Sequence, residues 1–244
     1  MKKIFAGVAT MKDRQYALSK VIEAISPQVE RLTIYCDYEY TPIYDNYYPN
    51  AVFIKRGDNP TLGDAGKFAG LALLEKEERE DSVYITIDDD LIYPPDFASR
   101  LTNALDLYDR KAVVGFHGWN AKPNQRSYHR DRMEVFHLRA PLANDTYAHV
   151  IGSGATAFYV PTLAGLGLSY FQRPNMADLW LSLFCNERNI PRVVLAHDPD
   201  YIPLSPYVDH NKETIWAWNA NNPEKERFQT ELLNSANWNY GKTV

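Results

Sequence analysis

The sequence predicts an α/β protein with a mainly parallel central sheet flanked by helices. Short runs of β-branched and aromatic residues alternate with longer segments whose apolar residues recur at helical spacing. The chain has 244 residues, 45% of them hydrophobic, which is enough for the core of one large domain of this class. The apolar run at residues 83–87 leads directly into three acids, and open α/β sheets bind ligands at the carboxyl ends of their strands.

The first half of the chain alternates strands with helices. Strands are expected where short apolar runs occur, at residues 3–8, 31–36, 51–55 and 83–87. Helices are expected over residues 15–25, 64–80 and 97–108, because their apolar residues fall on one face. Ser26 and Pro27 end the first helix, and the Tyr-rich segment 38–50 and the turn-rich segment 56–62 are expected loops. Because strands and helices alternate, we expect these strands to pair mainly in parallel.

The second half of the chain is less regular. Strands are expected at residues 112–117, 133–139 and 192–196, and helices over residues 179–187 and 223–235. The segment 118–132 between them is polar and basic. Gly152 and Gly154 indicate either a close approach of the backbone to another group or simple tight packing, and both interpretations stay open. Residues 201–244, rich in Pro, Asn and Trp, are expected to form a lid or wrap over a single domain.

The most informative stretch is the acidic triplet Asp88, Asp89 and Asp90. Pro94 and Pro95 prevent the preceding strand from continuing, so the acids lie in a turn at the mouth of the sheet. Adjacent like charges repel, and burial increases the cost, so a cation would stabilise them. Oxygen ligands alone suit a hard ion, Mg²⁺ or Mn²⁺, shared with phosphate oxygens. The plainer alternative is a strand end followed by a solvated acidic turn.

Composition excludes several classes of protein. The net charge of −5 argues against a broad nucleic-acid-binding surface, although the basic segment 118–132 leaves room for a local one. Cys36 and Cys185 lie far apart and match no zinc pattern, which favours a reducing, cytoplasmic location. No secretory leader and no apolar stretch near the ~20 residues of a membrane span is expected. The glycine patterns of Rossmann dinucleotide sites and of P-loops are absent from the sequence.

With these residues in view, the chain resembles glycosyltransferases of the GT-A fold, nearest to the bacterial family 2 type. Four features carry the resemblance in chain order, over residues 3 to about 200. They are the loop 9–14, Asp37 after the second strand, the segment 63–68 followed by an Asp-x-Asp motif at residues 88–90, and the segment 152–159 followed by residues 176–182. The resemblance implies a GT-A domain with a Rossmann-like nucleotide-sugar-binding half at residues 1–110 and an acceptor and catalytic half at residues 111–200.

The resemblance also implies roles for individual residues. The donor nucleotide would contact Thr10, Arg14, Asp37, Asp64, Lys67, Asp88 and Asp89. Within that set, Thr10 would hold the nucleoside, Asp37 the uracil edge, and Asp88 would lie near the ribose. Asp90 would bind the metal that bridges both phosphates, together with His197, or with His210 in its place. Asp178 would be the catalytic base.

Each of these residues also has a plainer interpretation. Asp64 and Asp178 are acids that the helix dipole favours in a first turn. Lys67 is equally well a solvated cation, and His197 an ordinary histidine at a strand end. Many family members have a second acid beside the base, whereas Ala177 and Leu179 flank Asp178 here, which leaves the stereochemistry of transfer open.

The expected function is therefore that of a Mn²⁺- or Mg²⁺-dependent glycosyltransferase. It would move a sugar from a UDP-sugar to a hydroxyl of a glycan or of a lipid-linked saccharide of a surface polysaccharide. Three alternatives stay open: transfer to a modified base in DNA, which the acidic total does not favour, a nucleotidyltransferase, and a carbohydrate-binding module without activity. The donor sugar, the acceptor and the oligomeric state are not predicted.

Overall fold

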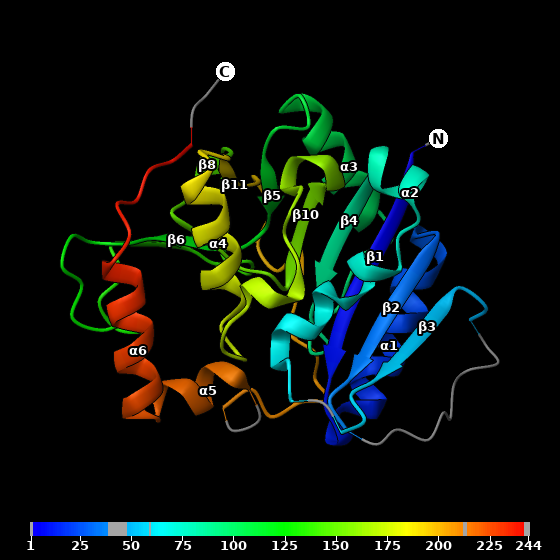
Figure 1. Cartoon of the computed structure of the whole chain (residues 1–244), viewed down its shortest axis with the longest axis horizontal. Helices are drawn as coiled ribbons and strands as arrows, with labels where there is room; N and C mark the ends of the chain where they lie inside the picture. Colours follow the sequence, from blue (N-terminus) through cyan, green and yellow to red (C-terminus); the bar gives the residue numbers. More distant parts are fainter. Residues whose placement is uncertain (1, 39–47, 59, 212–213, 242–244) are drawn as a thin grey trace.

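An eight-stranded sheet forms the centre of the protein, with helices on both faces (Figure 1). The structure is a computed structural model that describes residues 2–38, 48–58, 60–211 and 214–241. In spatial order the strands are β3 (Ala51–Lys55), β2 (Arg31–Cys36), β1 (Lys3–Thr10), β4 (Ser82–Ile87), β10 (Ala155–Tyr159), β5 (Val113–Gly115), β11 (Arg192–Val194) and β8 (Thr146–Tyr147). All neighbours pair in parallel except β10 and β8, which are antiparallel to the strands beside them. The predicted α/β class with a mainly parallel sheet is confirmed.

The strand order changes direction between β1 and β4. The chain builds β2 and β3 outward on one side of β1, then returns to place β4 on the other side. Ligands of open α/β sheets bind outside the carboxyl ends of strands at such a switch point. In this protein those two ends are Thr10 and the turn that begins at Asp88. The topology therefore brings the loop after the first strand next to the acidic triplet.

The helix expected over residues 64–80 is divided in two, so this prediction was wrong in its continuity. A 3₁₀ helix, η3 (Gly63–Leu73), is followed by a short α-helix, α2 (Lys76–Glu80). The first part packs very closely on the sheet, since a β-carbon at Gly66 would lie 2.0 Å from the ring of Tyr35. The tighter 3₁₀ form suits such an approach. The second helix starts afresh with a capping box between Glu75 and Glu78.

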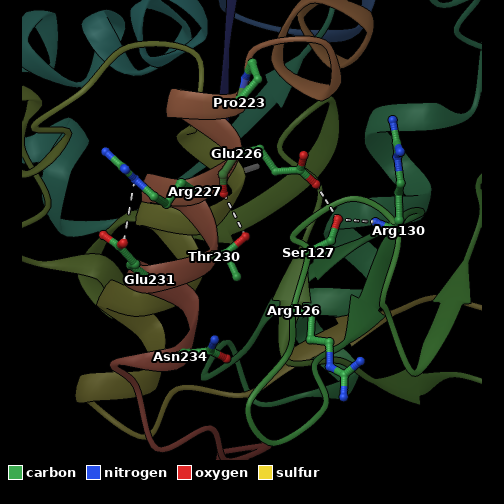
Figure 2. A pocket seen from close by; sticks show the side chains of 9 residues that line it. All are labelled: Arg126, Ser127, Arg130, Pro223, Glu226, Arg227, Thr230, Glu231 and Asn234. Carbon is green, nitrogen blue, oxygen red and sulfur yellow. Dashed lines mark hydrogen bonds and ion pairs between the residues drawn. The ribbon is translucent and has the colours of Figure 1, made fainter.

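The second half of the chain adds a small sheet and the C-terminal helices. The strands β7 (Glu134–Phe136), β6 (Gly118–Asn120) and β9 (Val150–Ile151) form a three-stranded sheet. The strands expected at 112–117, 133–139 and 192–196 are all present but shorter. Two helices follow late in the chain, α5 (Ile215–Ala220) and α6 (Pro223–Asn234). Helix α6 packs beside the basic segment 118–132, where a cavity of about 360 Å³ lies between them (Figure 2).

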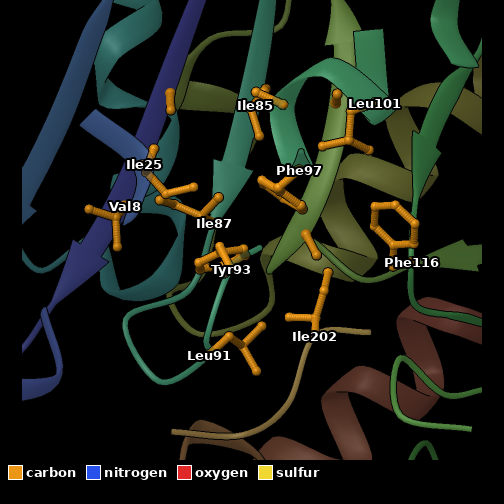
Figure 3. Packing of buried hydrophobic residues seen from close by; sticks show 14 of the residues in the cluster. Val8, Ile25, Ile85, Ile87, Leu91, Tyr93, Phe97, Leu101, Phe116 and Ile202 are labelled. Atoms are coloured by element: carbon orange, nitrogen blue, oxygen red, sulfur yellow. The ribbon is translucent and has the colours of Figure 1, made fainter. Parts of the chain in front are cut away.

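The core fills both faces of the central sheet. Side chains on one face, such as Val8 and Ile85, pack against α1 (Gln15–Ile25) and α3 (Phe97–Leu107) (Figure 3). Alternate side chains of the same strands, such as Phe5 and Tyr84, form a second cluster with η3 and with α4 (Ala177–Glu187). This alternation is the period of a strand buried on both faces. Because the core is continuous around β1 and β4, it holds their carboxyl ends in fixed positions.

The remaining short elements are 3₁₀ turns at η1 (Lys12–Arg14), η2 (Ser26–Gln28), η4 (Val160–Leu163) and η5 (Leu168–Tyr170). The segment after residue 200 returns to the acidic turn, where Leu204 forms an antiparallel bridge with Leu91. Asn239 accepts a hydrogen bond from Arg192 at the other end of the sheet. Within the described residues, no helix combines the length and apolar character needed to cross a bilayer.

Candidate active site

Two acids of the triplet are neutralised by an arginine from the first loop. The Nη1 atom of Arg14 lies 2.7 Å from Asp89 Oδ1 and 3.0 Å from Asp90 Oδ2. The hydroxyl of Thr10 donates to the other oxygen of Asp89 at 2.7 Å. These contacts join the carboxyl ends of β1 and β4, as the strand order requires. Thr10, Arg14 and Asp89 thus bind one another, and their expected contact with a donor nucleotide stays a prediction.

Burial and the charge of Arg14 shift the pKa values of Asp89 and Asp90 in opposite directions. Burial raises the pKa of Asp89 to about 6, although the charge of Arg14 opposes the shift. Burial and the neighbouring Asp88 also raise the pKa of Asp90, while Arg14 and His210 lower it. The positive charge that the sequence analysis sought from a metal is therefore supplied in part by Arg14.

Asp88 binds a different cation from the one that binds Asp89 and Asp90. Its side chain is 40% exposed, and its Oδ1 atom accepts a hydrogen bond from Nζ of Lys67, which is 3% exposed. Burial alone would lower the pKa of Lys67, but the carboxylates of Asp88, Asp64 and Asp178 outweigh it and raise the pKa. Lys67 is thus a buried, charged side chain between several acids.

The glycine-rich segment approaches Asp88 closely. A β-carbon on Gly154 would lie 1.9 Å from Asp88 Oδ2, a distance no side chain tolerates. The hydroxyl of Tyr93 fixes the same turn, because it donates to the carbonyl of Gly154 at 2.6 Å and accepts from the amide of Asp88 at 2.8 Å. Of the two interpretations that the sequence left open for Gly154, a close backbone approach applies here.

Ser153 connects Lys67 to the candidate base, Asp178. Nζ of Lys67 donates to the Ser153 hydroxyl at 3.3 Å. The amide and the hydroxyl of Ser153 donate to Asp178 Oδ1 at 2.7 and 2.6 Å. In the described part of the chain, Oδ2 of Asp178 has no hydrogen-bond partner. Asp178 is therefore held by one oxygen and presents the other, and a continuous polar chain runs from Asp88 through Lys67 and Ser153 to Asp178.

Asp64 supports the helix that carries Asp178. Its two oxygens accept hydrogen bonds from the amides of Met176 and Ala177 at 3.1 and 2.9 Å, at the start of α4. This is the capping arrangement that orphan amides of a helix N-terminus require. Burial raises the pKa of Asp64 to about 6, Lys67 lowers it, and Asp178 raises it further. The carboxylate serves as a cap from a distant segment, and its predicted contact with the donor stays a prediction.

Asp37 lies beside this cluster, at the end of β2. Its amide donates to the carbonyl of Thr10 at 3.1 Å, and its carboxylate accepts from the hydroxyl of Thr61 at 2.5 Å. Arg56 Nη1 is 3.5 Å from the other oxygen. The predicted contact of Asp37 with a uracil edge remains a prediction. The neighbouring Tyr-rich loop, residues 38–50, lies largely outside the described residues.

The two candidate histidines occupy different surroundings. Nδ1 of His197 lies 2.7 Å from the carbonyl oxygen of Leu195, and Nε2 lies 3.3 Å from the carbonyl oxygen of His137. In contrast, Nδ1 of His210 lies 3.8 Å from Asp90 Oδ2. The structure therefore favours His210, the second histidine of the prediction, as the partner of Asp90.

The carboxylates suit a metal that arrives with its own ligands. Among the described residues, no three His, Cys, Asp or Glu side chains converge into a ready-made metal centre. Mg²⁺ nevertheless needs only one or two protein carboxylates when phosphates and water supply the rest. Asp88 and Asp90, which are close enough for the charge of Asp88 to raise the pKa of Asp90, provide such oxygens. The donor set fits a hard divalent ion shared with a diphosphate rather than a permanently bound one.

Sequence reasoning missed Ser153 and the supporting role of Asp64. Ser153 lies between two glycines, and this local pattern indicates only backbone freedom. Its contacts with Lys67 and Asp178 join residues 86 and 25 positions apart, and the contact of Asp64 with Met176 spans 112 positions. A pattern within one short segment cannot indicate contacts between residues so far apart in the sequence.

Comparisons with known proteins found similar structures but no match by sequence. No protein-family model and no curated protein matches the chain. A structure of S. aureus TarS residues 1–349 is similar at 11% identity and a TM-score of 0.49, covering 82% of this chain and 59% of that one. A longer S. aureus TarS structure gives 12% identity and a TM-score of 0.49, covering 82% of this chain and 36% of that one. The chain thus spans less than two thirds of either TarS chain.

A third similar structure is 4-diphosphocytidyl-2C-methyl-D-erythritol synthase. It gives 12% identity and a TM-score of 0.48, covering 96% of this chain and 99% of that one. The chemistry of the present chain is therefore argued from its own residues.

Proposed function

We propose that this protein is a glycosyltransferase that moves a sugar from a UDP-sugar to an acceptor hydroxyl. The observation that carries the proposal is the polar chain from Asp88 through Lys67 and Ser153 to Asp178, at the switch point of the sheet. It connects a carboxylate suited to a phosphate-bound cation with a carboxylate that has one unpartnered oxygen. Those are the two groups that transfer from a nucleoside diphosphate requires.

The donor side would bind the diphosphate. Asp90 and Asp88 would hold Mg²⁺ or Mn²⁺ together with the phosphate oxygens, and the ion would stabilise the charge that develops on the leaving diphosphate. His210 would lie beside this ion, since its Nδ1 atom is near Asp90. Lys67 keeps Asp88 in place and contributes positive charge to the same region. Asp37 and Thr10, at the ends of β2 and β1, would face the nucleoside.

The acceptor side would rely on Asp178. A hydroxyl is a weak nucleophile, so a carboxylate within hydrogen-bond reach has to accept its proton. In the proposed reaction Asp178 Oδ2 takes that proton while the acceptor oxygen forms a bond to the anomeric carbon. The bond between that carbon and the diphosphate oxygen breaks, and its electron pair leaves with UDP. The amide and hydroxyl of Ser153 hold Oδ1 throughout and so aim Oδ2.

A panel of UDP-sugars with simple saccharide acceptors tests this proposal. The wild-type protein is expected to release UDP from one donor in a metal-dependent manner. Asp178→Asn should reduce release by at least about 100-fold, the usual contribution of a general base, while UDP affinity changes little. Release of pyrophosphate from a nucleoside triphosphate instead would indicate a nucleotidyltransferase. Saccharide binding without any UDP affinity would indicate a carbohydrate-binding module.

A further inference from the structure

The basic segment 118–132 ends at an arginine whose position is fixed from two sides. The segment is anchored on α6, because the Ser127 hydroxyl donates to Glu226 (Figure 2). The Tyr128 amide also donates to the Thr230 hydroxyl, at 3.0 Å. Asn234 and Gln125 exchange two further hydrogen bonds of 2.8 and 3.0 Å. The segment is therefore attached along its length, and its last residue, Arg132, has a defined place.

The guanidinium of Arg132 stacks on two aromatic rings and makes one hydrogen bond, from its Nε atom. It lies 4.4 Å from the ring centroid of Trp119 and 5.3 Å from that of Tyr128, and its Nε donates to the Tyr128 carbonyl at 3.1 Å. Within the described residues, its two terminal nitrogens make no hydrogen bond and no ion pair. An arginine keeps its charge in any protein environment, and its planar fork matches the oxygens of a phosphate or a carboxylate. Arg132 is thus a half-buried cation that has no anionic partner among the residues that the structure describes.

This cation lies against the small sheet that leads into the turn holding Asp178. Trp119, on β6, pairs with Val150 on β9, and the chain continues from β9 directly into the turn whose Ser153 holds Asp178. Burial lowers the pKa of Arg132, and the negative charge of Asp178 raises it, so the two groups are within electrostatic range. Within the described residues, the two groups form no ion pair with each other, so the charge of Arg132 is available to a ligand.

A second unused polar group lies at the same turn. The ring of His117 packs on Gly152, where a β-carbon would be 2.7 Å from its Cδ2 atom. Burial, with His137 and Arg132, lowers the pKa of His117 to about 3 against the opposing effects of a backbone hydrogen bond at Phe136 and of Asp88, so the imidazole is neutral. Its Nδ1 atom is buried and has no hydrogen-bond partner in the described structure. A buried nitrogen without a partner costs free energy, which a hydroxyl donated by a ligand would recover.

Resting on the proposed transferase function, we propose that Arg132 binds an anionic group of the saccharide acceptor, a phosphate or a carboxylate, next to the carboxylate of Asp178. The terminal nitrogens of Arg132 would form two parallel hydrogen bonds to that group, and His117 would contact a sugar hydroxyl. The anionic acceptor would then be oriented with its reacting hydroxyl toward Asp178 Oδ2. The stacked rings of Trp119 and Tyr128 keep the guanidinium in one plane, which a bidentate contact needs.

Calorimetric titration of the full chain, without UDP, with three matched probes tests this inference. The probes are methyl α-glucoside, its 6-phosphate and methyl α-glucuronoside, which share a ring and differ in charge. One or both charged sugars are expected to bind at least about tenfold more tightly than the neutral one, and the stronger of the two identifies the anion. Arg132→Gln should remove this preference and Arg132→Lys should keep part of it, because a point charge remains without the fork.

Arg130→Gln is the matched control, because Arg130 is an exposed arginine of the same segment (Figure 2). It should leave the preference intact. Equal losses in Arg130→Gln and Arg132→Gln would overturn the inference in favour of general surface charge, as would equal binding of the three probes or no binding at all. A circular dichroism spectrum for each variant checks the fold. A parallel UDP titration separates the two proposals: UDP binding without anion preference refutes only the role of Arg132, and the reverse refutes only the transferase proposal.

Discussion

Replacing Ser153 by alanine tests the link between Lys67 and Asp178 most sharply. The substitution removes the hydroxyl that donates to Asp178 Oδ1 at 2.6 Å and accepts from Lys67 at 3.3 Å, but it keeps the backbone amide contact of 2.7 Å. Ser153 is 1% exposed, so water cannot replace the lost donor freely. A buried hydrogen bond to a charged group contributes about 1.5–3 kcal/mol, so we expect the free energy of unfolding to fall by about 2 kcal/mol.

The turnover of Ser153→Ala should also fall, through the orientation of Asp178 rather than through the loss of stability. With one of its two donors missing, the carboxylate of Asp178 is no longer fixed in orientation, and misplacement of a catalytic group by about 1 Å costs roughly 100-fold in rate. We therefore expect the turnover of Ser153→Ala to fall by about 10- to 100-fold, while UDP affinity stays within about threefold, since the donor acids keep their partners. Steady-state kinetics with calorimetry of UDP binding measures both quantities.

Ser182→Ala provides the matched control. Ser182 is also buried on α4, its hydroxyl donates to the backbone carbonyl of Asp178 at 2.6 Å, and it accepts from the amide of Ile151 at 3.0 Å. Its loss should cost a similar ~2 kcal/mol, because a buried amide is left without a partner. It does not touch the Asp178 carboxylate, so turnover should stay within about threefold of wild type. Equal losses of turnover in the two variants, or full turnover in Ser153→Ala, would refute the orienting role of Ser153.

Three further predictions concern the acids and their partners. Gly154→Ala should weaken metal-dependent UDP binding, because its β-carbon would lie 1.9 Å from Asp88 Oδ2 and displace that carboxylate, whereas Gly167→Ala, with no atom within 4 Å, should be neutral; calorimetry that finds both variants alike would contradict this. Arg14→Met leaves two buried carboxylates without their cation and should lower the free energy of unfolding by about 3–5 kcal/mol in urea titrations, so that a loss below about 1 kcal/mol would speak against the pairing. The carboxyl of Asp64 has a pKa of about 6 in the folded protein and 3.8 ordinarily, so folding takes up a proton between these values and stability falls as pH rises from about 4 to about 6, by up to about 3 kcal/mol. This pH dependence should weaken in Asp64→Asn, and parallel curves for the two proteins would contradict the assignment.

The parts of the fold set by short segments were predictable from the sequence. Strands β1, β2, β3 and β4 and helices α1 and α3 appear within about one or two residues of the expected ranges, because each is specified by its own apolar pattern. The single helix expected over residues 64–80 failed, since close contact with Tyr35 and a local capping box act against the helical period. The later strands β5, β7 and β11 are shorter than the expected ranges, and β7 lies in a segment that is largely exposed, so its alternating pattern alone does not fix its length.

The composition of the candidate site was predicted better than its connections. The strand-end argument identified the acidic triplet, the family resemblance added Thr10 and Arg14, and parallel topology brings the ends of β1 and β4 together. The argument from like-charge repulsion correctly required a cation, but it could not tell a metal ion from Arg14 and Lys67, which both bind the triplet here. Side-chain partners of this kind come from segments distant in sequence, and only the folded chain determines them.

Calorimetric titration of UDP into the full-length protein, with and without Mn²⁺, tests the central claim most directly. Saturable binding of one UDP per chain that tightens at least about tenfold with the ion, and loses that dependence in Asp90→Ala, is the predicted result. An absence of UDP binding in both conditions would contradict the assignment of this strand-end cluster to a nucleotide-sugar donor.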